Sequence, residues 1–520
     1  MTRPELLLTL PSPPGTGPDG DRHEIASNTL SQPLTDRTLD AHGLRLTVPT
    51  YDRSALTPAV VHFSVGGFHR SHQLLYFEEV AERRISTDWG VVGVGLRSPD
   101  MRNALAPQNH LYTVVARSPD GEHARVVGVM VDYLFAPDAP GRVLDLLSAE
   151  STRMVSLTIT GGGYRLCPQT SAFDADDPDI RWDLIATDQP RTVFGFLVEG
   201  LDRRRRAGLP PFTVVSCDNM HRNGDATRAA VLGFARLRDR ELAHWIAETV
   251  AFPSSMVDRI TPHTAPEERA AVAARYGVDD RWPVITEPFS QWFIEDNFSH
   301  GRPPLEEVGV RFVPDVARYE LMKTRLLNAG HCALGYLGTL AGHSSIDRVM
   351  AEPLFARYIA TLMDDEVTPL LPPPDGIDLT DYKRTLMLRF ANPAIADQLT
   401  RLCRRGSTKM PHHLLPSLRQ AVDEARPHGL LTLAVAAWFR YLHGTDETGR
   451  PIVIDDPRGE LLRALARAGG TDPRPLLSER SIFGTLGDSP SFVAELERTL
   501  IRLDLDGVRA TLATALGMSR

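Results

Sequence analysis

The sequence of 520 residues is poor in cysteine, with one cysteine at each of positions 167, 217, 332 and 403. The four are dispersed, and no two have the Cys-x-x-Cys spacing. So few separated thiols support neither a disulfide-stapled scaffold nor a cysteine zinc site. We therefore expect a cytoplasmic protein that needs no metal.

Long hydrophobic runs are also missing. The longest, residues 430–439, has about half the length of a membrane span and ends at Arg440, so it predicts a buried helix. The apolar stretch at residues 6–10 is shorter than the core of a signal peptide and runs into Pro11. Neither stretch indicates a membrane partner.

A surplus of basic residues is absent as well. The chain has 57 Lys and Arg against 66 Asp and Glu, a net charge of −9. Proteins that bind a phosphate backbone need clustered cations, so nucleic acid is not an expected partner. The hydrophobic share of 42% is ordinary for a globular protein. At about 150 residues per domain, the length predicts two to four domains.

The leader, residues 1–50, begins with a stretch rich in Pro, Gly, Asp and Thr up to about residue 30. Such a composition buries too little apolar surface to offset the entropy of ordering, so we expect disorder at the start of the leader.

From residue 51 the pattern changes to short apolar segments, bounded by glycine, that alternate with helical spacing. The expected strands are residues 59–65, 90–96, 111–116, 154–159 and 212–216. This alternation is typical of a parallel sheet covered on both faces. After residue 252 helical patterns dominate, at residues 317–340, 414–424 and 427–442. The predicted fold class is α/β, with a Rossmann-type parallel-sheet domain at residues 51–251 and a mostly α-helical substrate and catalytic domain at residues 252–520.

A glycine turn follows the first expected strand and opens a helix, as in the phosphate turn of a dinucleotide fold. Its candidate cofactor-binding residues are Ser64, Val65, Gly66, Gly67 and Phe68. Small residues are needed there because the backbone must approach the pyrophosphate closely. Ser64 stands where G-x-G-x-x-G has its first glycine, and the third glycine is missing.

Polar residues near this turn have two interpretations each. Arg70 would meet phosphate or a neighbouring loop. After the second strand, Arg97 favours a 2′-phosphate and Asp100 a free 2′-hydroxyl, so NAD and NADP both stay open. His69 and His72 have the spacing of half a metal site, but no third ligand stands at helical spacing, so we expect them to pack or hydrogen-bond.

The segment around Lys323 is the most informative for chemistry. On a helical wheel with Lys323 at 0°, Glu320 falls at about 60°, His331 at about 80° and Asn328 at about 140°. A lysine, an amide and an imidazole on one face are what oxidation of an alcohol requires, namely a base, a donor to the alkoxide and a group that orients hydroxyls. Free lysine has a pKa of about 10.4, so such a base needs burial or a nearby cation.

Several motifs in order resemble the polyol-specific long-chain dehydrogenase family. They are VGGFHRSHQ at 65–73, LTITGGGY at 157–164, SCDNM at 216–220, FPSSMVDRITP at 252–262, TEPFSQW at 286–292, the Lys323 helix, RFANP at 389–393 and residues 401–411. Together they cover roughly residues 55–500 in the family's order.

The resemblance implies an NAD(P)-dependent oxidoreductase that interconverts a polyol and a ketose, with mannitol and fructose first. It implies that Lys323 is the general base, that no metal is needed and that Asn219 and Asn328 form an oxyanion hole. The other site residues that it implies are Asp258, His331 and Glu320, with Arg401 and Lys409 in the substrate pocket. It also places the active site between the two domains and favours a monomer.

Three positions depart from the family's pattern. Ser64 replaces glycine, Gly161 stands where glutamate is usual and His221 where glutamine is common. The first departure bears on cofactor affinity, because serine tolerates such a turn less well than glycine. The second bears on proton relay or hydration near the nicotinamide.

Two further functions stay open beside the first. Within the family, fructuronate reduction to mannonate or oxidation of a pentitol such as arabinitol is the alternative, because the basic cluster at residues 401–409 offers a partner to a carboxylate. From another class, a nucleotide-binding sensor without turnover would explain the departures at Ser64 and Gly161, although the Lys323, Asn219 and Asn328 set argues against it.

Overall fold

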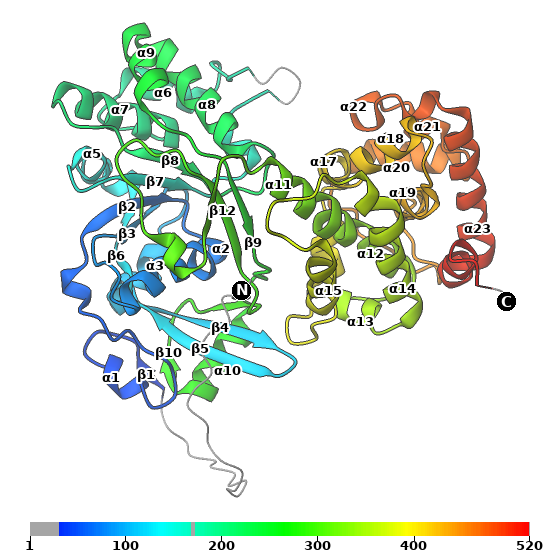
Figure 1. The fold of residues 1–520 in the computed structure, drawn as a ribbon, viewed down its shortest axis with the longest axis horizontal. Coiled ribbons are helices and arrows are strands. Elements are labelled where there is room, and N and C mark those ends of the chain that lie inside the picture. The colour runs from blue at the N-terminus through cyan, green and yellow to red at the C-terminus, as the bar shows by residue number, and fades with distance from the viewer. Residues whose placement is uncertain (1–30, 168–171, 519–520) are drawn as a thin grey trace, which may run out of the picture. The chain divides into compact units, whose positions relative to one another are not determined.

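The computed structural model describes residues 31–167 and 172–518 (Figure 1). The disorder expected at the start of the leader concerns residues 1–30, which lie outside the described residues. The chain divides into two compact units, Met1–Val316 and Ala317–Arg520.

The first unit is built on a five-stranded parallel sheet in the order β6-β3-β2-β7-β8. The strands are β2 (Pro58–Phe63), β3 (Gly90–Gly95), β6 (Met130–Phe135), β7 (Met154–Leu157) and β8 (Thr213–Ser216). The chain starts in the middle of the sheet, runs to one edge and returns to the other, which is the Rossmann order. The predicted fold class is confirmed, and the reversal of direction lies between β2 and β7, where such sheets bind ligands.

Helices cover both faces of this sheet, as the apolar strands require (Figure 1). On one face Val61 and Phe63 of β2 pack with helices α5 (Pro140–Ser148), α7 (Val193–Arg206) and α8 (Asn223–Arg238). On the other face Val60 packs with helix α3 (Gln73–Glu82). Alternate residues of one strand therefore belong to two different cores.

Residues 252–316 belong to the first unit, and the division at Val316 differs from the boundary expected after residue 251. Strand β11 (Val284–Thr286) pairs with β4 (Tyr112–Ser118), which pairs with β5 (Gly121–Val127). A further sheet joins β9 (Ser255–Asp258), β12 (Gln291–Glu295) and β13 (Arg311–Val313). These strands have three to five residues, except β4 and β5, and so carry too little periodicity for recognition in the sequence.

The later part of the leader is also folded into this unit. Strand β1 (Gln32–Pro33) pairs with β10 (Val278–Asp279), and Leu34, Leu39 and Leu46 are buried.

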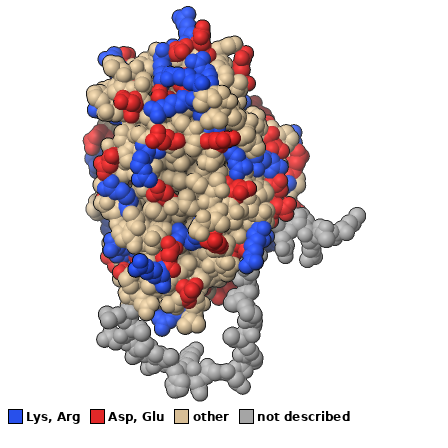
Figure 2. All heavy atoms as spheres, turned by 90° about the vertical axis from the view of Figure 1, so that its left-hand side faces the viewer, with Lys and Arg blue, Asp and Glu red and all other residues tan. Residues whose placement is uncertain are grey.

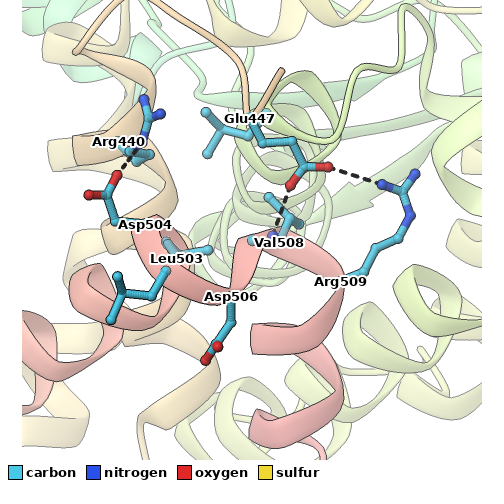
Figure 3. Close-up of a pocket in the computed structure, with 10 residues that line it drawn as sticks. Arg440, Glu447, Leu503, Asp504, Asp506, Val508 and Arg509 are labelled. Atoms are coloured by element: carbon cyan, nitrogen blue, oxygen red, sulfur yellow. Dashed lines mark hydrogen bonds and ion pairs between the residues drawn. The ribbon is translucent and has the colours of Figure 1, made fainter. Parts of the chain in front are cut away.

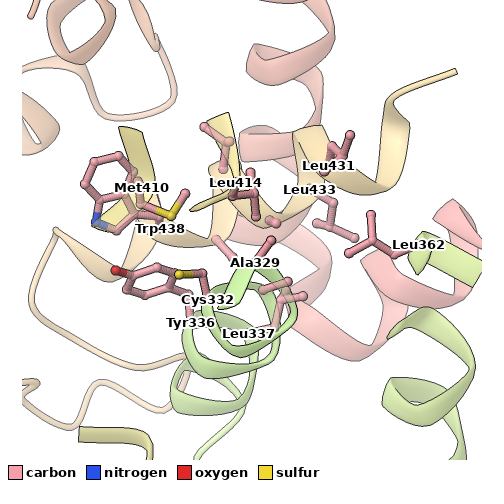
Figure 4. Close-up of a cluster of buried hydrophobic side chains, with 14 of the residues drawn as sticks. Ala329, Cys332, Tyr336, Leu337, Leu362, Met410, Leu414, Leu431, Leu433 and Trp438 are labelled. Carbon is pink, nitrogen blue, oxygen red and sulfur yellow. The ribbon is translucent and has the colours of Figure 1, made fainter. Parts of the chain in front are cut away.

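The second unit is mostly helical. Its core packs α12 (Ala329–Leu340) against α19 (Gly429–Tyr441), where Ala329 and Leu337 lie near Leu431 and Leu433 (Figure 4). Helix α19 contains residues 430–439, which are all buried, as the sequence predicted. None of the helices in the described ranges is long and apolar enough to cross a membrane.

Charges of both signs are interspersed over the face of the molecule that Figure 2 shows, with basic side chains gathered at its upper end. In the first unit, helix α7 ends in four consecutive arginines, of which Arg204 is buried. Arg203 pairs with Glu199, and Arg206 pairs with Asp202. Acids of the same helix thus offset part of the charge of this basic run, while Arg204 donates to backbone carbonyls.

Candidate active site

The phosphate turn of the first unit begins at Ser64, directly after β2. Its φ is +70°, in the left-handed region that glycine adopts without cost. For serine this conformation costs about 1–2 kcal/mol, so surrounding contacts must impose it. The sequence predicted glycine-like geometry here, and the structure shows that serine adopts it.

Packing does not require glycine at positions 66 and 67, where there is open room for a side chain. Gly66 has φ −119° and ψ −173°, which any residue adopts. A Cβ built on Gly66 would meet nothing within 4 Å, and one on Gly67 would meet only ordinary contacts, the nearest at 3.7 Å from Thr261. Since the fold itself does not need glycine at these positions, the room fits the close approach of a pyrophosphate. The turn therefore fits a dinucleotide.

The other residues predicted to bind the cofactor lie in different surroundings. Val65 is buried, and Phe68 stacks on His72 with ring centroids 4.9 Å apart. Arg70 is buried, donates to the Trp282 carbonyl and lies 5.2 Å from the centre of the Tyr112 ring. Of its two interpretations, the neighbouring loop is thus the one that its contacts match.

Arg97 and Asp100 follow β3, the strand beside β2, and both side chains are exposed. This is the place from which an acidic or basic side chain reaches the adenosine ribose in Rossmann folds.

The loop after β8 carries Asn219 and is tied to the loop after β7 by a buried carboxylate. Asp218 accepts hydrogen bonds from the Ile159 and Thr160 backbone N–H groups at 2.9 and 2.8 Å and from the Tyr164 hydroxyl at 2.8 Å. Burial raises the pKa of Asp218 and that of Tyr164. Asn219 itself is exposed. Sequence reasoning quoted Asp218 within a motif but assigned it no role.

Asn223 links the same loop to the strand that ends at Asp258. Its amide N–H group donates to the carbonyls of Asp218 at 3.0 Å and Ser255 at 2.8 Å, and its amide oxygen accepts from the Ser255 N–H at 2.9 Å. Asp258 lies at the end of β9 and is buried. Asn219 and Asp258 thus stand on segments that the side chain of Asn223 holds together.

In the second unit, the helix of Lys323 contains a π-helical turn. Helix α11 (Ala317–Lys323) continues into a π-helix at Thr324–Asn328 and then into α12. The Ala329 N–H reaches the Thr324 carbonyl, five residues back. Such turns are frequent at functional sites.

The π-helical turn contains one residue more than an α-helical turn. It therefore narrows the angular range of the polar stripe that the sequence predicted. When residue i+5 takes the place of i+4, Asn328 moves from about 140° to about 40° from Lys323, and His331 moves to about −20°. Lys323, Asn328 and Glu320 are 7%, 8% and 6% exposed. The structure therefore brings these groups together more closely than a regular helix would.

His331 lies in electropositive surroundings. Burial lowers the pKa of its imidazole well below the usual range, and neighbouring cations, Arg401 first and then Arg389, lower it further. The ring lies 4.9 Å from Phe390. Its Nε2 atom is buried and has no hydrogen-bond partner among the residues that the structure describes. A neutral imidazole with an unused nitrogen can hydrogen-bond a substrate hydroxyl.

His413 belongs to the same surroundings. Burial lowers the pKa of His413 to about 3, with Lys409 and Lys323 contributing. Sequence reasoning missed His413 and Arg389, although His413 stands one helical turn after Lys409 and Arg389 opens the RFANP motif.

The two predicted substrate-binding cations are anchored by protein groups. Arg401 donates through Nε to Asp397 at 2.6 Å and pairs with the other oxygen of that buried carboxylate. Lys409 donates through Nζ to the carbonyls of Arg401 at 3.2 Å and Leu402 at 3.1 Å. Burial lowers the pKa of Lys409.

A cavity of about 370 Å³ in the second unit lies away from these residues. It is formed at the kink of α23 (Pro490–Ala515) at Gly507 (Figure 3). Glu447 accepts from the Val508 N–H and pairs with Arg509, and Arg440 pairs with Asp504. Most of its charged side chains thus pair with one another, and we assign this cavity no chemistry.

The described residues contain no group of three or more His, Cys, Asp or Glu side chains placed to hold a metal ion. His72 lies within hydrogen-bond distance of the Gln291 carbonyl at 3.0 Å, and His69 stacks on His62. The pair thus packs and hydrogen-bonds.

Comparison with known proteins identifies the family. The model of the mannitol dehydrogenase Rossmann domain matches residues 58–307, and that of the mannitol dehydrogenase C-terminal domain matches residues 315–504. A mannitol 2-dehydrogenase of Aspergillus fumigatus is 47% identical over 481 residues, 91% of this chain and 96% of that protein. The chain belongs to the mannitol dehydrogenase family. The resemblance found in the sequence is confirmed.

Solved structures agree with this family. The mannitol 2-dehydrogenase of Pseudomonas fluorescens, in a ternary complex with NAD and D-mannitol, is 43% identical with a TM-score of 0.85, covering 94% of this chain and 100% of that chain. A D-sorbitol dehydrogenase in substrate-free form is 36% identical with the same TM-score, covering 92% of this chain and all of that chain.

Proposed function

We propose that this chain is an NAD-dependent mannitol 2-dehydrogenase that interconverts mannitol and fructose. The broader class, a nicotinamide-dependent polyol dehydrogenase, follows from its family. The relatives named for mannitol and the solved complex with NAD and D-mannitol support the choice of substrate and cofactor. The open room at Gly66 supports dinucleotide binding independently of these relatives.

The observation that carries the mechanism is that Lys323 and Asn328 flank the π-helical turn on one helical face and are both buried. The chain has three lysines, Lys323, Lys383 and Lys409, against 54 arginines, the remainder of its 57 basic residues. Arginine cannot release its proton in a protein, whereas lysine can when it is buried. Nearly all basic residues of this chain are arginines, but position 323, where we propose the base, is a lysine.

In the proposed reaction, the C2–O–H group of the polyol becomes a carbonyl. When bound, NAD supplies the acceptor for the hydride that leaves the carbinol carbon. Lys323 Nζ takes the hydroxyl proton, and Glu320, one turn earlier, passes it to solvent. The Asn328 amide donates to the oxygen as negative charge develops on it, which lowers the barrier.

The remaining candidates hold the substrate in place. His331 offers its unused Nε2 to a hydroxyl, and Arg401 offers the N–H groups that Asp397 does not occupy. Asn219, from the first unit, is the second donor to the oxygen, and Asp258 orients a further hydroxyl. Lys409 supports this pocket from the carbonyls of residues 401 and 402.

We also propose that the reaction needs no metal and that the protein is a cytoplasmic monomer. Full turnover after treatment with a chelator and a single-chain mass in solution are the expected results. A loss of activity that zinc restores would contradict the first of these proposals.

Reduction of fructuronate is the second candidate, because cations outnumber carboxylates around His331. A sugar acid would place its carboxylate among Arg389, Arg401 and Lys409. Comparing kcat/KM for mannitol and mannonate decides between the two substrates, with mannitol expected to be higher.

The test of the proposed function follows absorbance at the reduced-nicotinamide band with mannitol, sorbitol, arabinitol and mannonate, each with NAD and NADP. We expect the highest kcat/KM for mannitol with NAD. If the chain binds the cofactor but neither oxidises any of these substrates nor reduces fructose or fructuronate, the enzyme proposal is overturned and a nucleotide-binding sensor is favoured.

The scarcity of lysine allows a direct test of the base. Reductive ¹³C-methylation labels only three side chains and the chain's amino terminus, so each methyl signal can be assigned by single substitution. The proposal requires the Lys323 signal to titrate well below the pKa of about 10.4 of free lysine. Titration of the Lys323 signal at that ordinary value would contradict a lysine base.

A further inference from the structure

The strained residue of the phosphate turn is held on both sides of its backbone. The Ser64 N–H donates to the Val94 carbonyl of β3 at 2.8 Å. The Ser64 carbonyl accepts from the Thr158 hydroxyl, also at 2.8 Å. The two bonds come from the two strands beside β2, since Thr158 directly follows β7. Together they set the orientation of both peptide groups that flank Ser64.

The second bond determines the protonation of a buried histidine. Thr158 has one hydroxyl proton and gives it to Ser64, so its oxygen must accept the bond from His62 Nε2 at 2.9 Å. His62 therefore carries its proton on Nε2. Its Nδ1 then accepts from the Ser156 hydroxyl at 2.8 Å. Every polar atom of the neutral ring is satisfied, and an added proton on Nδ1 would break the bond from Ser156.

The ring of His62 is also fixed from its face. It is fully buried and stacks on His69 with centroids 3.3 Å apart and an interplanar angle of 5°. His69 belongs to α2 (Gly67–Ser71), the segment that begins at the second of the two glycines. The charged and titratable groups that act on the ring of His69 include Arg70 and His72. The stack thus connects the strand to the segment beyond the turn.

We propose that Thr158, oriented by His62, is a positioning residue that holds Ser64 in the left-handed conformation and so shapes the phosphate turn for the dinucleotide. This inference rests on the proposed function, because it concerns the affinity for a nicotinamide dinucleotide. Serine needs this clamp because, unlike glycine, it resists positive φ. Thr158 and His62 act through the backbone of the turn and need no contact with substrate.

The first test measures the Kd for NADH by fluorescence titration and kcat at saturating cofactor. We expect Thr158→Val to raise the Kd about 10-fold, as for loss of one part-buried hydrogen bond, with kcat at saturation nearly unchanged. Thr158→Ser keeps the hydroxyl and should restore the Kd. The matched control is Thr113→Val, because Thr113 is buried on β4 and its hydroxyl has no partner among the described residues.

The second test separates a clamp on Ser64 from a direct contact with the cofactor. Glycine adopts positive φ unaided, so adding Thr158→Val to Ser64→Gly should leave the Kd of Ser64→Gly unchanged. A 10-fold loss in that background would overturn the inference, because Thr158 would then act on the cofactor itself. This comparison holds even if Thr158→Val alone does not fold.

The outcomes distinguish this inference from the proposed function. If the wild-type chain does not bind NADH or NAD, the proposed function fails. If the wild-type chain binds and Thr158→Val binds equally well, only the clamp is wrong. A Kd that rises equally for Thr158→Val and Thr113→Val would also overturn the clamp, since general core damage would then explain both.

Discussion

Histidines of the two units are kept neutral in different surroundings. In the first unit His62 is buried between neutral hydroxyls and the ring of His69. In the second, His331 and His413 lie among cations that include Lys409. Both ring nitrogens of His62 have hydroxyl partners, whereas His331 Nε2 has no partner among the described residues.

The difference teaches how each unit contributes to function. Polar side chains of the first unit, such as Thr158, Asp218 and Asn223, hold backbone in place. In the second unit, Lys323, Asn328 and His331 stand on one helical stripe and present their own functional groups. We therefore expect substitutions of Thr158, Asp218 and Asn223 to change binding or stability, and substitutions on the stripe to change turnover.

The largest effect is expected at Lys323. Lys323→Ala should lower kcat by about 10³-fold, because the alcohol proton loses its acceptor, while the Kd for NADH stays the same. Steady-state kinetics and cofactor titration measure the two quantities. Lys383→Ala is the matched control and should change neither. Near-normal turnover in Lys323→Ala would end the proposed mechanism and the contrast between the units.

A smaller loss of turnover is expected at the amide on the same stripe. Asn328→Ala should lower kcat by about 10²-fold, the usual cost of one donor to a developing oxyanion. Asn219→Ala should show a similar loss if it is the second donor. The control is Asn103→Ala, at an exposed position of α4 (Asp100–Leu105). A change confined to KM would assign these amides to substrate binding instead.

Stability should respond most to the buried carboxylate of the first unit. Asp218→Asn replaces one acceptor oxygen by an amide N–H group, so one of three donors loses its partner. We expect the free energy of unfolding to fall by about 1–3 kcal/mol in urea titration. Asp145→Asn, at an exposed ion pair with Arg203, should change it by less than about 0.5 kcal/mol. Equal effects would show that Asp218 is not a structural link.

Acid should destabilise the first unit, because His62 must take up a proton on unfolding. The pKa of His62 is lowered to about 3 in the folded chain and is about 6.5 when unfolded. Below pH 6.5 the unfolded chain binds more protons, so stability is lost as pH falls from 6.5 toward 3, by about 2 kcal/mol at pH 5 for this residue.

In the second unit, Lys409→Met should raise the pKa of His413 because it removes a neighbouring cation, and should leave that of His62 unchanged. Imidazole NMR titrations measure both values. A shift at His62, or none at His413, would remove the electrostatic distinction between the units.

The smallest effect is expected at the turn. Ser64→Gly relieves the left-handed strain but increases the freedom of the unfolded chain, so the free energy of unfolding should rise by less than about 1 kcal/mol. Urea titration of this variant measures the change. A clear loss of stability would mean that the Ser64 side chain contributes more than its strain costs.

Much of the fold could be read from local patterns. The apolar runs at residues 59–65, 90–96 and 154–159 correspond to three neighbouring strands of the parallel sheet. Strand β6 was not among the expected strands, and β4 was expected but pairs in a different sheet. Pairing partners are set by contacts between distant segments, which a single strand's composition does not encode.

Part of the candidate site could also be predicted from the sequence. Periodicity placed Lys323, Asn328 and His331 on one face, and the glycine turn was found at its observed position. The scaffold around them was not predictable, because Asp218 and Thr158 act on backbone groups far away in the sequence or on another strand.

The sequence by itself determined the family, the order of the chemical groups along the chain and the scarcity of lysine that singles out Lys323. Only the tertiary structure decided that a π-helical turn draws those groups into one stripe, that residues 252–316 complete the first unit and that serine takes a left-handed turn. The physical reason is that local spacing sets which residues share a face, whereas hydrogen bonds and packing between distant segments set the exact backbone path.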